Sequence, residues 1–408
     1  MDSEQAVATA SAASEHPLRN AAYRRWLIGN GVSLLGDQFY LVALPWLVLE
    51  KFGSAAMLGS LMMVGAIPRA VLLLVGGAAT DRFSARRIML TTAVVRTLSV
   101  AATGTLVVHG HLHAAEMYLL VAVFGIADAF AMPAQSAYLP AILHKEQLVA
   151  GSGLGQSVAQ LASIIGPIPA GLLVGRLGAG PAFYIDAASF LVVIAALLRL
   201  PDPPRKPSPL HPVKAIAEGI LYVARDVPLR TMMALGMTVN MCIAGPLAVG
   251  IAYVVRLHAG SSTVYGVLVS AAAAGGLAGA LAAGAWRVRR RGSAMLGGTA
   301  LLGLCLCCIS LLSAHFYALS VVLAFMGGIA GFINIHIGAW VMQRIDVDVR
   351  GRVSSVLILV SLGAVPISMG LAGFVVAYSA AAMFVVAGVA LLGVAALVAD
   401  SASIRQIA

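Results

Sequence analysis

Four ionisable residues lie in apolar stretches of the sequence, where a charge is costly: Asp37, Arg69, Arg96 and Asp128. Each stretch has about 20 or more apolar residues, enough for a helix to cross a bilayer. Ionisable groups at that depth typically pair with one another or relay protons. Burial favours the neutral carboxyl and a nearby arginine favours the carboxylate, so an acid that moves between these surroundings can bind and release a proton. The four residues therefore predict proton coupling, with structural ion pairs as the alternative.

Asp37 is the best placed proton carrier of the four. Asn30, Ser33, Asp37 and Tyr40 recur at three- and four-residue spacing, which puts them in one polar stripe of a helix. Asp37 lies about ten residues into its run, or about 15 Å at 1.5 Å per residue. Asp128 ranks second and shares its helix face with Gln135. Asp186, near the outer end of its run, is interpreted as structural.

The second half of the chain offers polar but uncharged residues at a similar depth. We therefore expect coupling in the first half and substrate contact across both halves. Phe332 and Trp340 flank His336 at four-residue spacing, which favours a packed, hydrogen-bonded histidine over a substrate ligand. The candidate substrate contacts are Ser33, Tyr40, Gln135, Asn240, Asn334 and His336.

The composition is that of a membrane protein. Of the 408 residues, 60% are hydrophobic and 10% are charged, whereas a soluble domain carries about a quarter charged residues. We expect an all-α integral membrane fold with twelve transmembrane helices. The apolar runs that predict them are 27–49, 55–79, 88–108, 116–138, 151–175, 181–200, 230–255, 263–285, 293–313, 316–341, 353–378 and 380–399.

A hydrophilic interval divides these runs into six and six. It opens with a proline-rich segment at 201–209, which favours an extended linker, and then regains helical character from Val213 to Arg225, as a surface amphipathic helix would. The predicted organisation is a disordered cytosolic tail (1–18), a six-helix bundle (19–200), a cytosolic linker with an amphipathic helix (201–229), a second six-helix bundle (230–400) and a short cytosolic tail (401–408).

The positive charges predict the orientation of the helices. Most of the 26 lysines and arginines fall in the two tails and in alternate loops. Short basic loops stay in the cytosol, so both termini are expected there, in a multi-pass protein of the inner or plasma membrane. This asymmetry also accounts for the net charge of +10 without a nucleic-acid partner, because the basic residues do not form one patch.

The two halves share a pattern. Asp37 with Pro45 is echoed by Asn240 with Pro246, the basic loop 82–87 by 287–291, and the pair 166–167 by 365–366. Repetition of this kind is typical of transporters, whose substrate site lies near the midplane between the repeats. The fold class predicted is therefore two six-helix pseudo-repeats.

One short loop carries an acid and three arginines between two membrane-length runs: Gly77, Asp81, Arg82, Arg86 and Arg87. A role in fixing topology explains the arginines but not Asp81. The pattern Gly-x-x-x-Asp-Arg-x-x-x-Arg-Arg resembles the signature loop between helices 2 and 3 of the major facilitator superfamily. The resemblance implies a gating role, with Asp81 beside the start of helix 11 at 351–354.

A second motif lies in the fifth run, at Gly153, Gly166, Pro167 and Gly171, with alanine replacing two further glycines. It resembles the antiporter motif of superfamily exporters; an ordinary close-packed glycine face is the alternative. The segments 36–45, 133–140, 183–190 and 350–353 look like the branch that includes macrolide efflux proteins and the enterobactin exporter. The helix 4 arginine of many drug–proton antiporters is missing here.

These features together predict a secondary active exporter of a small amphipathic molecule, such as a drug, secondary metabolite or siderophore. A proton gradient, rather than a bound cofactor, is the expected energy source. The expected partners are the small-molecule substrate, protons and the lipid bilayer, and the resemblance implies a monomer. An importer or facilitator of the same fold is the alternative, followed by a membrane sensor or enzyme. No metal site is expected, although His109, His111 and His113 alternate in an outer loop.

Overall fold

The chain folds into helices throughout the part that the structure describes. The structure is a computed structural model that describes residues 16–202, 212–286, 288, 290–346 and 349–399, without the side chains of 212–216, 350–352 and 354–355. It contains 12 helices long and apolar enough to cross a membrane. The twelve-span prediction is confirmed.

The first half contains six spans. They are α2 (Ala21–Lys51), α3 (Ala55–Arg82), α4 (Ala85–Val108), α5 (Ala114–Ile142), the pair α6 (Leu148–Ile165) and α7 (Pro167–Leu177), and α8 (Ala179–Leu198). Two 3-10 turns, η1 (Pro17–Arg19) and η2 (Lys145–Gln147), precede α2 and α6.

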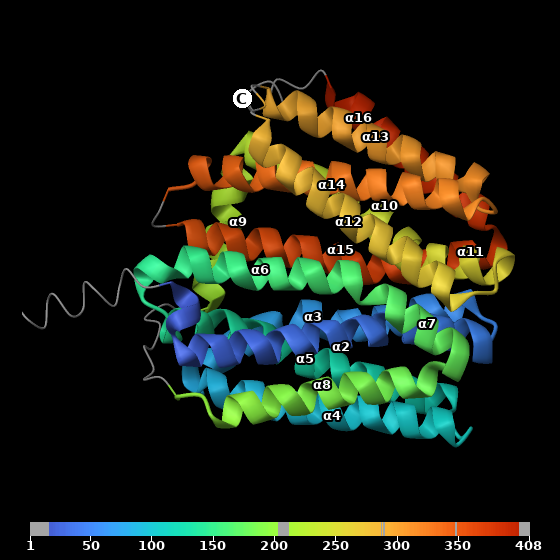
Figure 1. Cartoon of the computed structure of the whole chain (residues 1–408). Helices are drawn as coiled ribbons and strands as arrows, with labels where there is room; N and C mark the ends of the chain where they lie inside the picture. Colours follow the sequence, from blue (N-terminus) through green and yellow to red (C-terminus); the bar gives the residue numbers. More distant parts are fainter. Residues whose placement is uncertain (1–15, 203–211, 287, 289, 347–348, 400–408) are drawn as a thin grey trace, which may run out of the picture.

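The second half follows the surface helix α9 (Pro212–Arg225). Its spans are α10 (Val227–Gly245) with η3 (Pro246–Gly250) and α11 (Ile251–His258), α12 (Ser262–Ala285), α13 (Arg291–Leu312), α14 (Phe316–Arg344), α15 (Arg350–Tyr378) and α16 (Ala380–Ala399). The two halves form separate layers of roughly parallel helices in Figure 1, and α15 of the second half packs against α3 of the first half where the layers meet.

Side-chain caps define where several of these helices begin. The hydroxyl of Ser54 accepts a hydrogen bond from the amide of Met57 (3.1 Å), and the carboxylate of Asp226 accepts one from the amide of Leu229 (3.0 Å). Such caps satisfy amides that have no partner within the helix. The tight turn from α7 to α8 needs Gly178, whose φ is +78°.

Two of the spans are interrupted at prolines. The fifth span breaks between α6 and α7 at Gly166–Pro167, and the seventh contains the π-helical turn η3, which begins at Pro246. Proline removes a backbone donor and crowds the preceding turn. Pro45 and Pro366 occupy the matching positions of the other half but lie inside the continuous helices α2 and α15. The halves therefore share a helix order but bend in different places.

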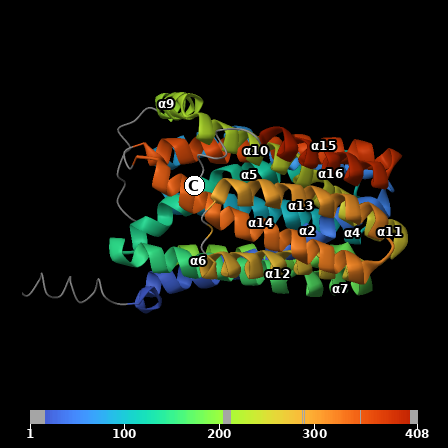
Figure 2. The same ribbon diagram turned by 90° about the horizontal axis from the view of Figure 1, so that it is seen from above.

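The two ends of the helix layers differ in how the halves meet. We call the end where α8 finishes and α9 lies the linker end, and the opposite end the far end (Figures 1 and 2). One buried apolar cluster joins both halves from the middle of the helices to the far end, including Trp46, Leu58, Val254 and Tyr265. At the linker end each half has its own cluster, around Tyr138 in the first half and around Trp340, Leu229 and Met295 in the second.

Close contacts between the halves follow the same pattern. A Cβ atom on Gly59 of α3 would overlap the backbone of α15 at Gly373. The hydroxyl of Ser262 donates to the carbonyl of Gly171 at 2.8 Å, and the amide of Gln160 donates to the carbonyl of Ala273 at 2.9 Å. These contacts run from the middle of the helices to the far end, so the far end is where the halves are sealed together.

Candidate functional site: a buried charge cluster in the first half

The four ionisable residues singled out in the sequence meet in one cluster. Asp37, Arg69, Arg96 and Asp128 come from α2, α3, α4 and α5. Nη2 of Arg96 lies 3.4 Å from Oδ1 of Asp37 and 3.3 Å from Oδ1 of Asp128. Nη2 of Arg69 pairs with Oδ2 of Asp128. Arg96 therefore bridges both acids, and Asp128 is held by both arginines.

Aromatic rings hold the guanidinium of Arg96 in place. Its Cζ lies 4.8 Å from the ring centroid of Phe124 and 4.4 Å from that of Phe190. Tyr40 stacks on Phe124 at 4.8 Å between centroids. A cation over aromatic faces gains attraction from the ring quadrupoles, and more so away from water. The side chain of Arg96 is 10% exposed and that of Arg69 is 39% exposed, so Arg96 is the buried arginine of the cluster.

A third acid, Asp186 of α8, lies beside the cluster. It is fully buried, it interacts electrostatically with Asp37 and Arg96, and a Cβ on Gly36 would reach its carboxylate. The hydroxyl of Ser189 lies 3.5 Å from Oδ1, and Oδ2 has no hydrogen-bond partner among the described residues. The sequence interpretation treated this acid as structural and did not connect it with Asp37.

The described cluster therefore contains three carboxyls and two guanidinium groups. If every group were ionised, its formal charge would be −1. The clue in the sequence is the segment 183–190, which carries Asp186 and Ser189 at helical spacing. Only the packing of α8 against α2 brings that segment to Asp37.

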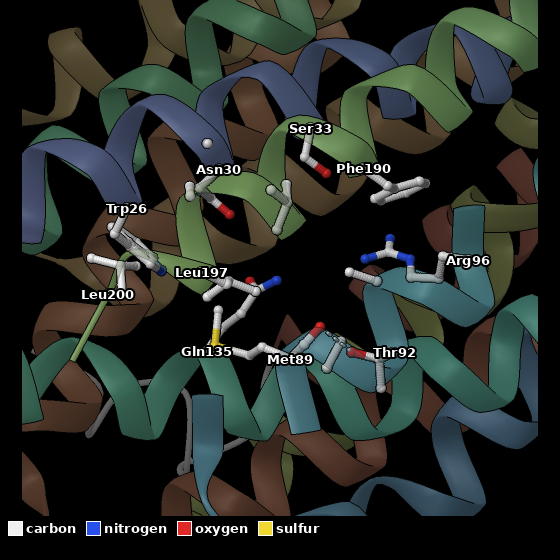
Figure 3. Close-up of a pocket in the computed structure, with 15 residues that line it drawn as sticks. Trp26, Asn30, Ser33, Met89, Thr92, Arg96, Gln135, Phe190, Leu197 and Leu200 are labelled. Carbon is white, nitrogen blue, oxygen red and sulfur yellow. Dashed lines mark hydrogen bonds between the residues drawn. The ribbon is translucent and has the colours of Figure 1, made fainter. Parts of the chain in front are cut away.

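Two of the predicted substrate contacts, Ser33 and Gln135, face a cavity inside the first half (Figure 3). Its lining comes from α2, α4, α5, α8 and the residue Leu200, and includes no described residue of the second half. Tyr40 lies in the aromatic stack near Arg96. The structure thus places Ser33 and Gln135 in a cavity lined by described residues of the first half alone, and Tyr40 in the aromatic stack around Arg96 and against the apolar cluster shared by both halves.

The second-half candidates lie on two helices, α10 and α14. The amide of Asn240 donates to the carbonyl of Gly236 in its own helix at 3.1 Å. His336 is buried with its ring 4.6 Å from that of Phe332, and its Nε2 has no hydrogen-bond partner in the described structure. Asn334 is exposed on the protein surface. The expected hydrogen bond of His336 is thus absent from the described contacts, and its packing against Phe332 is present.

The basic loop organises the linker end of the first half. Arg86 donates from Nε to the carbonyl of Leu197 (2.7 Å) and from Nη2 to that of Leu198 (2.9 Å). These carbonyls end α8, where helices lack internal donors and attract cations. Arg87 lies 3.8 Å from the carboxylate of Asp202, which also accepts from Ser84. The sequence did not indicate Asp202 as part of this loop.

The remaining gating residues are more open. Asp81 and Arg82 are exposed, and a Cβ on Gly77 would meet no atom within 4 Å. The predicted contact between Asp81 and the start of helix 11 falls on side chains at 351–354 that, apart from Val353, lie outside the described residues. That contact stays a prediction.

The residues of the antiporter-like motif have different surroundings. Gly171 packs against the α12 backbone at Ser262, and Gly166 packs against Gln38 of α2. A Cβ on Gly153 would meet nothing within 4 Å. The close-packing argument therefore applies to Gly166 and Gly171 but not to Gly153.

The outer-loop histidines have local partners. Nδ1 of His109 lies 2.9 Å from the carbonyl of Thr105, and Nδ1 of His113 lies 3.4 Å from the carboxylate of Glu116. Across the described ranges, no three His, Cys, Asp or Glu side chains are grouped as a metal site would require.

Known proteins resemble this chain in sequence and in fold. The sequence profile of the Major Facilitator Superfamily matches residues 26–260. The multidrug efflux pump Tap of Mycobacterium tuberculosis is 30% identical over 354 residues, 83% of each chain. Macrolide efflux protein A of Streptococcus pyogenes is 27% identical over 233 residues, 55% of this chain and 56% of the relative.

Solved transporter structures share the fold. A point variant of the nucleoside transporter NupG superposes with a TM-score of 0.77 at 11% identity, covering 95% of this chain and 99% of that one. A POT family transporter superposes with a TM-score of 0.71 at 14% identity, covering 92% and 95%. At these identities the likeness shows the fold alone. The profile match and the relative at 30% identity show the family: the chain belongs to the major facilitator superfamily of membrane transporters.

Proposed function

We propose that this protein is a proton-coupled exporter of a small amphipathic molecule, acting as a monomer with both termini in the cytosol. The relatives named as a multidrug efflux pump and a macrolide efflux protein support both the direction and the class of substrate. The basic tails and alternate loops support the orientation. Each chain carries both halves of the pseudo-repeat, so one copy supplies the two sides of a transport path.

The packing of the halves supports alternating access. The apolar core is continuous at the far end and divided between the halves at the linker end. With the linker end in the cytosol, this arrangement suits loading of substrate from the cytosol while the outer side is sealed. Export then requires the far-end contacts at Gly59, Gly171 and Ser262 to open as the linker end closes.

The charge cluster is the observation that carries the proton coupling. Three carboxyls face two guanidinium groups, and an unbalanced charge away from water is costly. One bound proton would balance the cluster. Asp37 is the proposed carrier because it pairs with one arginine, Arg96, whereas Asp128 pairs with both arginines. Each nearby arginine favours the carboxylate, so the acid with fewer arginine partners binds a proton more readily. The side chain of Asp37 is also 27% exposed, against 12% for Asp128, so it is the less enclosed of the two acids.

The test uses purified protein in proteoliposomes with an imposed pH gradient and a radiolabelled macrolide as the probe. Wild-type protein should concentrate the probe against its gradient. Asp37→Asn should abolish uphill transport yet keep binding and downhill exchange, because the amide preserves shape without binding a proton. Macrolide binding by the variant should lose most of its dependence on pH. A variant that still concentrates the macrolide would move the coupling site elsewhere, with Asp128→Asn as the next test.

A further inference from the structure

A cavity lined by both polar and apolar side chains lies inside the first half, between the charge cluster and the linker end. Arg96 lines it at one end, Trp26 and Leu200 line it at the other, and Asn30 and Gln135 point into the space between (Figure 3). Trp26 and Asp37 are eleven residues apart on α2. At 1.5 Å per residue, the Trp26 end of the cavity and the charge cluster at Asp37 are therefore separated by about 16 Å along the helix. The cavity therefore extends along the helices from the cluster toward the linker end.

Two buried donors at the ends of this cavity have no protein partner. Nε1 of Trp26 and Nε of Arg96 are buried and lack a hydrogen-bond partner within the described residues. Trp26 and Arg96 are each 8% exposed. A buried donor without an acceptor costs about 1–3 kcal/mol, so such groups in folded proteins normally bond to ordered water. Both donors thus call for an acceptor inside the cavity.

The cavity is large enough for a few water molecules but not for a larger ligand. About 30 Å³ of the cavity is open to the centre of a water molecule. A buried water needs roughly 10–15 Å³ measured this way, so the cavity has room for about two or three. The polar side chains that line it, which would alternate with those waters, are Asn30, Ser33, Thr92 and Gln135. A macrolide or other drug could not enter a space of this size.

We propose that water in this cavity carries protons between the charge cluster and the linker end, on a path separate from the surface where the halves meet. The inference rests on the proposed proton coupling. Each water molecule accepts a proton on one side and releases one on the other. The water chain itself is therefore unchanged, and each proton that the cluster binds is removed from the solution at the linker end. The substrate would move between the halves while the proton moves within the first half.

The charges around the inner end of the path favour this transfer. A lone arginine there would repel an approaching proton, but Arg96 is paired with Asp37 and Asp128. The other titratable groups around the cluster are Tyr40, Arg69 and Asp186. Three acids against two arginines leave the described cluster negative overall when all are ionised, and this charge attracts a proton.

The transport test uses variants that either fill the cavity or remove a polar side chain from its lining. Ala93 of α4 lines it, and its exposed neighbour Val94 does not. Ala93→Leu should slow macrolide transport driven by a pH gradient by about tenfold or more, which is about 1.4 kcal/mol of barrier. Macrolide exchange at equal pH on both sides should stay at the wild-type rate. Val94→Leu is the matched control and should leave both rates unchanged.

A second variant guards against misfolding of the filled cavity. Gln135→Leu replaces the amide by an apolar side chain of similar size, so it removes the hydrogen bonds to the proposed water and should also slow gradient-driven transport. Gln135→Asn keeps the amide and should restore most of the rate. If Ala93→Leu and Gln135→Leu both transport at the wild-type rate while Asp37→Asn is uncoupled, the water path is wrong and the proposed function stands. If Asp37→Asn remains coupled, the proposed proton carrier fails first.

A spectroscopic test of the water does not depend on transport. The test uses protein whose other tryptophans are replaced (Trp46→Phe, Trp286→Phe and Trp340→Phe). The fluorescence emission of Trp26 should then be red-shifted relative to that of a buried tryptophan without water contact, because its indole donates a hydrogen bond to water. Adding Ala93→Leu should shift that emission to the blue. Blue emission in the parent protein, or no shift with Ala93→Leu, would overturn the proposal.

Discussion

Replacing Arg96 should destabilise the protein in a way that depends strongly on pH. Arg96→Met removes the ion-pair partner of Asp37 and leaves Asp128 with Arg69. Breaking a buried pair by deleting one partner costs about 3–5 kcal/mol, because the other charge stays buried and uncompensated. At pH 8 we therefore expect the free energy of unfolding to fall by about 3–5 kcal/mol.

Lowering the pH should relieve most of this loss. An uncompensated carboxylate can bind a proton, at a cost of about 1.36 kcal/mol per pH unit above the usual aspartate pKa of about 3.9. At pH 5 that route limits the charge penalty to about 1.5 kcal/mol. The variant should therefore be closer to wild type at pH 5 than at pH 8, which is opposite to the acid sensitivity of a stabilising carboxylate pair.

The assay is the melting temperature of purified protein in detergent, at both pH values and relative to wild type at each. Arg69→Met is the matched control and should cost less, since the side chain of Arg69 is 39% exposed and that of Arg96 is 10%. Adding Asp37→Asn to Arg96→Met should recover more stability at pH 8 than adding Asp128→Asn. Equal losses for the two arginine variants, or a loss independent of pH, would refute the reasoning.

Three further predictions concern the loops and helix contacts. Gly166→Leu should make transport leaky or impair folding, because Gly166 is in close contact with α2, whereas Gly153→Leu should be tolerated, since nothing lies within 4 Å of a Cβ there; a well-folded, fully coupled Gly166→Leu protein would argue against the sealing role. Asp81→Asn should slow macrolide turnover with little change in binding affinity, and transport at the wild-type rate would remove its gating role. Arg86→Met should lower the melting temperature, since two hydrogen bonds from a charged group are worth about 1.5–3 kcal/mol each, and Arg82→Met at an exposed position should not; equal melting temperatures for these two variants would contradict the capping of α8.

The sequence alone was sufficient for the class of the protein and for most of the charge cluster. Apolar runs of about 20 residues have few stable arrangements other than membrane-spanning helices, because lipid cannot satisfy the backbone. Charges inside such runs are so costly that their presence indicates a site, and Asp37, Arg96 and Asp128 do lie together. The signature loop at 77–87 and the repetition between the two halves indicated the family, because few sequences place these residues at these spacings.

Only the tertiary structure decided which groups meet. Helical spacing places residues on a face but does not say which face of another helix lies opposite. For that reason Asp186 joins the cluster unexpectedly through the approach of α8 to Gly36, and Ser33 and Gln135 line an internal cavity rather than the surface between the halves. The division of the apolar core into one shared and two separate parts is equally invisible in the sequence, because it depends on how two six-helix units pack against each other, and a transporter must be able to change that packing.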